Sequence, residues 1–92
     1  MSHVKYDSLP EHMRDGAELY VERGIEPGDF MLAVLCNNLV RACERADSVN
    51  LRCMVEWATW LKWECPMAAW GSSSKVDDWV TSGGLQGEKV ES

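Results

Sequence analysis

The run FMLAVLCNNLVRACERA, from Phe30 to Ala46, constrains the fold more than any other part of the chain. Its first two turns are apolar on every side, and a polar face appears only after Asn37. A helix of this kind is stable when other helices surround it. A chain of 92 residues can form one core of useful size. The run therefore predicts a central helix over residues 30–46 in a single helical domain.

A helix is also predicted before this run, in the stretch PEHMRDGAELYVERG. Ser8 and Glu11 have the spacing of a capping box, in which each side chain accepts a hydrogen bond from the other residue's backbone N–H. Gly24 follows the last turn and suits the left-handed conformation that ends many helices. Gly16 lies inside the helix at a cost of about 1 kcal/mol relative to alanine, which close approach of a neighbouring helix would explain.

Two further helices are predicted in the second half of the chain. Asp47 or Ser48 can cap a helix over residues 49–64, which ends before Pro66. The apolar stripe of this helix predicts five buried residues, Cys53, Met54, Trp57, Trp60 and Leu61. A short helix follows the serines at 72–74 and ends at Gly83-Gly84.

The predicted fold class is therefore all-α, a compact bundle of about four helices with three main helices and one short C-terminal helix. No alternation typical of strands is present in the sequence. Residues 85–92 show no periodic apolar pattern, so they predict a disordered tail after a domain that spans residues 1–84.

The four cysteines, Cys36, Cys43, Cys53 and Cys65, are separated by seven, ten and twelve residues, which matches no CxxC pattern of a zinc site. In a reducing compartment such thiols are most simply buried apolar side chains. A metal site, disulfides and reactive thiols are the alternatives.

The sequence offers little of the chemistry that catalysis requires. The two histidines, His3 and His12, lie outside GxSxG and HExxH frames, and the glycines do not form a phosphate-binding loop. We therefore expect no enzymatic activity, no catalytic residue, no metal and no cofactor. His12 is predicted to be a partly exposed surface residue.

The charge of the chain is concentrated in one segment. Nine bases and fifteen acids give a net charge of −6, and residues 7–29 alone contain seven acids and two bases, a net charge of −5. Such a surface repels DNA and anionic membranes and attracts a basic partner. The start MSHVKYDS lacks the basic segment and apolar run of a secretory signal, so we expect a cytoplasmic protein.

Four acids in the first predicted helix, Glu11, Asp15, Glu18 and Glu22, are spaced by four, three and four residues. On a helix this spacing places them within a band of about 60°, and Glu26 and Asp29 extend it to a row about 20 Å long. The row is either a solvated face or a docking surface. Interleaved lysines usually relieve such repulsion, and none is present here, which favours docking to a groove lined with Lys and Arg.

The five tryptophans form the other unusual group, with Trp57, Trp60 and Trp63 at intervals of three residues. Trp57 and Trp60 fit the buried stripe, whereas Trp63 points away from it. An aromatic core accounts for most of them. Alternatively, Trp63 and Trp70 anchor a subunit or partner interface, which predicts a homo-oligomeric module and a possible homodimer.

The segments SLPEHMRDGAELYVERGIEPGDFMLAVLCNNL and WGSSSKVDDWVTSGGL resemble a set of small proteins encoded by tailed phages and prophages. The resemblance implies a mobile-element origin and an accessory role in infected bacteria. Many accessory proteins of this kind inhibit host defence, including anti-CRISPR proteins that present acidic surfaces in place of DNA. We therefore expect a phage-encoded, anti-CRISPR-like inhibitor in the bacterial cytoplasm that binds a host protein or ribonucleoprotein complex with a basic groove and does not bind nucleic acid directly.

Overall fold

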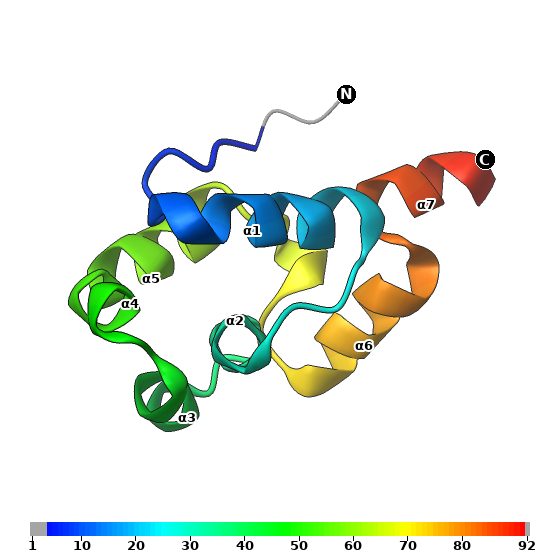
Figure 1. Cartoon of the computed structure of the whole chain (residues 1–92). Coiled ribbons are helices and arrows are strands. Elements are labelled where there is room, and N and C mark those ends of the chain that lie inside the picture. The colour runs from blue at the N-terminus through cyan, green and yellow to red at the C-terminus, as the bar shows by residue number, and fades with distance from the viewer. Residues whose placement is uncertain (1–3, 92) are drawn as a thin grey trace.

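The chain forms seven short α-helices and one 3₁₀ turn in a computed structural model that describes residues 4–91, with side chains described for residues 4–87 (Figure 1). The elements are α1 (Glu11–Arg23), α2 (Asp29–Leu35), α3 (Leu39–Arg45), α4 (Ser48–Arg52), α5 (Met54–Trp63), η1 (Met67–Ala69), α6 (Ser73–Ser82) and α7 (Gly84–Glu91). Between residues 4 and 91 no strand occurs, which confirms the all-α prediction. The radius of gyration is 12.3 Å, and a compact domain of this length has a value of about 12 Å.

The predicted central helix over residues 30–46 is wrong, because the chain breaks between α2 and α3. Asn37 adopts a left-handed conformation with φ 62°, and the Asn38 side chain caps α3 by accepting from the backbone N–H of Arg41 at 3.1 Å. Asparagine suits both roles, because its short polar side chain tolerates the left-handed conformation and can bond to nearby backbone N–H groups. The first part of the prediction is confirmed, since α2 is buried through Phe30, Met31, Ala33, Val34 and Leu35.

The helix predicted over residues 49–64 is also divided, at Cys53, into α4 and α5. Asp47 caps α4 as predicted, accepting at 2.7 Å from the backbone N–H of Asn50. The buried stripe is confirmed for Trp57, Trp60 and Leu61, whereas Cys53 and Met54 are half-buried. These two breaks, together with a further helix at residues 84–91, give seven helices in the described part where the sequence predicted about four.

Helix α1 begins without the predicted capping box. Pro10 is its N-cap, no side chain caps the first turn, and Ser8 is exposed. The preceding turn is fixed instead by Leu9, which is buried in the core and donates from its backbone N–H to the carbonyl of Tyr6 at 3.1 Å. Burial of an apolar side chain thus sets the approach to the helix where the sequence suggested a polar cap.

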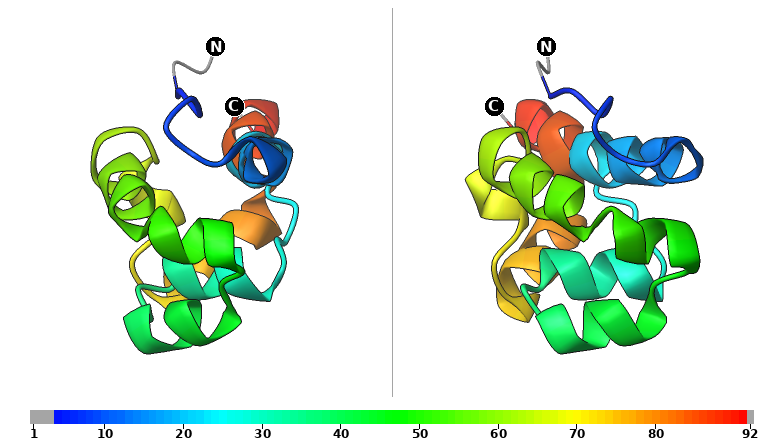
Figure 2. Two further views of the ribbon diagram at one scale, coloured as in Figure 1. Left: turned by 60° about the vertical axis from the view of Figure 1, so that its left-hand side comes forward. Right: turned by 90° about the vertical axis from the view of Figure 1, so that its left-hand side faces the viewer.

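Residues 84–91 form α7, which lies beside the C-terminal half of α1 (Figures 1 and 2). Gly83 ends α6 with φ +85°, as predicted, and the chain enters α7 at once. Leu85 is half-buried against the core. The prediction of a disordered tail from residue 85 is therefore corrected for residues 85–87, while Ser92 and the side chains of residues 88–91 lie outside the described part.

Buried polar contacts fix α1 against the C-terminal half of the molecule. The Tyr20 hydroxyl donates to the carbonyl of Ala69 at 2.6 Å, and the indole N–H of Trp79 donates to the carbonyl of Tyr20 at 3.0 Å. Both tie the inner side of α1 to η1 and α6. The opposite side of α1 is therefore the one that faces solvent.

Candidate functional site

The acidic side chains of α1 lie on its solvent side, as the spacing predicted. Glu11, Asp15 and Glu18 are exposed and Glu22 is half-buried. Among the residues with described side chains, none of these four carboxylates has a hydrogen bond or an ion pair. The neighbouring base Arg14 forms no ion pair with them, and its guanidinium donates instead to the backbone carbonyls of residues 7 and 9, each at 3.0 Å. Within the described part, therefore, no ion pair holds the carboxylates of this face.

A hollow of about 390 Å³ lies beside this face, between α1 and α7. Its lining comprises three of the four acids together with an apolar, a basic and an amide side chain, namely Asp15, Glu18, Glu22, Leu19, Arg23 and Gln86. The carboxylates can pair with a Lys or Arg side chain, and Leu19 can contact the methylene stem of such a residue. The sequence did not reveal the hollow, because Gln86 belongs to a segment that was predicted to be a tail.

The negative field of these acids reaches the N-terminal segment. The Tyr6 ring packs against Trp60 with 5.9 Å between centroids, and the Tyr6 hydroxyl is buried without a hydrogen-bond partner in the described part. Burial first, and then the charges of Glu22 and Glu18, raise the pKa of Tyr6 above its ordinary value. The Tyr6 phenol therefore stays neutral and does not add to the negative charge of the neighbouring acids.

The two remaining predicted acids lie beyond α1. Glu26 is in the link between α1 and α2, and Asp29 is the first residue of α2. Both are exposed. Because Gly24 turns the chain with φ +68°, the straight part of the row runs from Glu11 to Glu22, a length of about 16 Å at the helical rise.

The two tryptophans predicted at an interface differ in exposure. Trp63 is 71% exposed, and the ammonium of Lys62 lies 5.5 Å from its ring centroid. Trp70 is half-buried and packs against the core, and its indole N–H is buried without a hydrogen-bond partner in the described part. The structure thus places one large aromatic at the surface, and an interface role for the pair stays a prediction.

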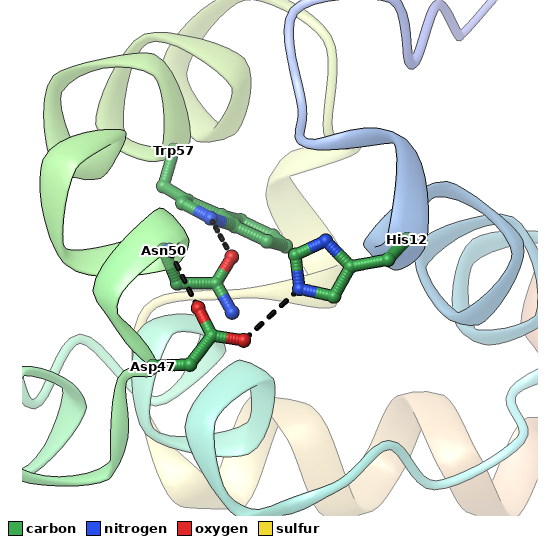
Figure 3. Close-up of polar contacts among 4 residues, drawn as sticks. All are labelled: His12, Asp47, Asn50 and Trp57. Atoms are coloured by element: carbon green, nitrogen blue, oxygen red, sulfur yellow. Dashed lines mark hydrogen bonds and ion pairs between the residues drawn. The ribbon is translucent and has the colours of Figure 1, made fainter.

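A chain of polar contacts connects the surface of α1 to the core (Figure 3). His12 Nε2 lies 3.1 Å from Asp47 Oδ2, and Asn50 Oδ1 accepts from the buried indole N–H of Trp57 at 3.2 Å. The hydrogen bond from the Asn50 backbone N–H lowers the pKa of Asp47, and the His12 contact lowers it further. Within the described part no hydroxyl or thiol bonds to His12. The contacts therefore connect α1 to α4 and do not include a nucleophile.

The four cysteines differ in burial. Cys65 is buried, and burial raises the pKa of its thiol to about 12. Cys36 and Cys53 are half-buried, whereas Cys43 is exposed, so the prediction of buried thiols is wrong for Cys43. All four are free thiols. In the described part no three His, Cys, Asp or Glu side chains are grouped as metal ligands.

A second hollow, of about 240 Å³, lies between α3 and α5 and is almost entirely apolar. Leu39, Ala42, Met54, Val55, Trp57 and Ala58 are among the residues that line it. The sequence did not reveal this hollow either, because residues 39–45 were expected in a helix surrounded by others. In the structure only Ala42 of α3 is buried, and the rest of the helix faces outward.

Comparison of the chain with protein-family models, curated proteins and solved structures finds no significant match. Among the helices of the described residues, none combines the length and the apolar character that crossing a bilayer requires.

Proposed function

We propose that this chain is a non-enzymatic, phage-encoded inhibitor of a host nucleic-acid-handling defence complex, of the anti-CRISPR kind. The observation that carries the proposal is the row of carboxylates on α1, with which no base among the described side chains forms an ion pair. The resemblance to small phage and prophage proteins supports the setting, the bacterial cytoplasm. The partner is a host protein or ribonucleoprotein with a basic groove.

The physical basis is imitation of a nucleic-acid backbone. A groove lined with Lys and Arg binds phosphates largely through charge, and a row of fixed carboxylates can occupy the same groove. The hollow between α1 and α7 offers three carboxylates to one inserted basic side chain. Competition with nucleic acid follows, without direct binding of nucleic acid by this chain.

The proposal is tested by reversing charge on this face and on another face. One variant carries Asp15→Lys, Glu18→Lys and Glu22→Lys, and its matched control carries Glu44→Lys, Asp77→Lys and Asp78→Lys on exposed positions of α3 and α6. Each set of changes brings the net charge from −6 to zero. Tagged wild type, variant and control are expressed in the bacterial host, and the co-purifying proteins are compared.

We expect the wild type and the control to capture the same nucleic-acid-binding complex and the α1 variant to lose it. Circular dichroism verifies that each protein is folded. Equal capture by a folded α1 variant would refute the proposal, as would a captured partner without a basic groove.

The alternative function is a homo-oligomeric interaction module that uses the Trp-rich surface, and the exposure of Trp63 favours it. It predicts that Trp63→Ala dissociates an oligomer present in the wild type. A wild type that stays monomeric at millimolar concentration would count against it.

A further inference from the structure

We propose that a second copy of this chain docks on the groove between α3 and α5, giving a two-fold dimer whose two acidic α1 faces remain free. This inference goes beyond the proposed function, because it concerns a different face of the molecule. The groove between α3 and α5 offers both a recess and protruding apolar side chains, and its charge suits contact with an identical surface.

Two exposed apolar side chains stand at the recess itself. Val55 and Leu39 line the hollow of about 240 Å³ and are 75% and 66% exposed, and Val40 in the next position of α3 is 70% exposed. An apolar cavity of about 150 Å³ holds a benzene molecule, so this hollow has room for an aliphatic side chain. A two-fold contact needs one surface to supply both the inserted side chain and the recess, and this face supplies both.

Exposed apolar side chains are concentrated in this part of the chain. Among the described residues, nine large apolar side chains are exposed, and five of them fall within residues 39–55, at positions 39, 40, 49, 51 and 55. The other four are spread from residue 19 to residue 67. A stable interface covers about 800 Å² of each partner. An interface of that size would cover about a seventh of the 5807 Å² accessible surface of this chain.

The charge of the segment favours a second copy as the occupant. Residues 39–63 contain four bases and three acids, a net charge of +1, whereas the rest of the chain carries −7. Two molecules that each carry −6 repel most when their α1 faces approach, and they repel less when they meet through α3 and α5, which keeps the two acidic faces apart. A dimer formed in this way keeps both acidic faces exposed.

Sedimentation equilibrium of the full chain at micromolar to millimolar concentration tests the proposal. We expect the mass to approach twice the chain mass of 10.4 kDa. Val55→Asp and Leu39→Asp each place a charge at an exposed position of the groove, so each should weaken the dimer about ten-fold or more while the fold is kept. Two variants are used so that a folding defect in one leaves the other as a test. Far-UV circular dichroism checks that each variant is folded.

Matched controls place the same kind of change elsewhere. Ile25→Asp changes an exposed apolar residue outside the groove, and Trp63→Ala removes the exposed aromatic of α5. We expect both to remain dimeric.

A second readout uses Cys43, which is exposed and one turn from Leu39 on α3. A short bismaleimide should join two chains through this thiol, and the product should vanish in Cys43→Ser and in Val55→Asp.

Three results would overturn the proposal. They are a wild type that stays monomeric throughout, a dimer that survives both groove variants, and a dimer that only Trp63→Ala dissociates. None of these results affects the acidic face, so this proposal and the proposed function can fail separately.

Discussion

Substitution of Gly84 by alanine should destabilise the protein strongly, because its Cβ would collide with the backbone of α1. Gly84 begins α7 and contacts the C-terminal end of α1, where Gly24 forms the left-handed cap. A Cβ on Gly84 would lie 2.5 Å from the backbone nitrogen of Gly24 and 2.8 Å from that of Arg23. These neighbours are backbone atoms, so no side-chain rotation relieves the contact.

Two costs add in this variant. Gly84 has φ +72°, a conformation that costs an L-residue about 1–2 kcal/mol. Forcing an extra carbon into a packed contact costs about 1–3 kcal/mol. The sum of about 2–5 kcal/mol is a large part of the 5–15 kcal/mol that stabilises a typical domain. At about 4–8 °C per kcal/mol for a chain of this size, Tm should fall by roughly 10 °C or more.

Urea denaturation followed by far-UV circular dichroism measures this cost, and Gly16→Ala is the matched control. A Cβ at Gly16 would lie 3.5 Å from Met31 Cε, an ordinary van der Waals contact. In mid-helix this change should stabilise the protein by up to about 1 kcal/mol. If Gly84→Ala leaves the free energy of unfolding within about 1 kcal/mol of the wild-type value, the close packing of α7 on α1 is refuted.

Two more predictions concern the contacts in Figure 3. Asn50→Ala leaves the buried indole N–H of Trp57 without its acceptor, so it should lower the free energy of unfolding, measured by urea denaturation, by about 1–3 kcal/mol. The same change should cost clearly less in a Trp57→Phe background, which lacks the donor. Equal costs in the two backgrounds would contradict the hydrogen bond. Asp47→Ala should lower the urea midpoint at neutral pH, and the gap from wild type should close as pH falls below about 4. The sign follows because the pKa of Asp47 is lowered in the folded state, so its stabilisation is present above the ordinary pKa and is lost on protonation. A gap that does not change with pH would contradict this reasoning.

The sequence was sufficient to predict the all-α class and several of the local signals that end or cap helices, although not the start of α1. Gly24 and Gly83 both adopt the left-handed caps, and Asp47 caps its helix, because each of these effects depends on a few adjacent atoms. Trp57 and Trp60 are buried as helical periodicity predicted. Such features need no knowledge of tertiary packing.

Helix breaks could not be predicted in the same way. Asn37 and Cys53 each interrupt a sequence whose apolar pattern continues across them, and the choice between a continuous and a broken helix depends on what packs on each side. The break at Asn37 has the larger consequence for the surface. It turns α3 outward and exposes Leu39 and Val40, which a straight helix would have carried into the core.

The candidate site was predicted in part. The band of acids on α1 follows from spacing alone, and the structure places its members on the solvent side of the helix. The hollow beside the band depends on α7, which docks on α1 through the Gly24–Gly84 contact although its own sequence lacks an apolar stripe. Contacts between residues 60 positions apart leave little trace in a single sequence.

The most direct test of the proposed function is displacement of nucleic acid from the captured host complex. Fluorescence anisotropy follows a labelled nucleic acid that is bound to this complex while the chain is added at low and at moderate salt. We predict release by the wild type and by the control with reversed charges on α3 and α6, weaker release as salt rises, and none by the variant with Lys at positions 15, 18 and 22. Release by that variant equal to the wild type, or simultaneous binding of chain and nucleic acid, would contradict imitation of nucleic acid by the acidic face of α1.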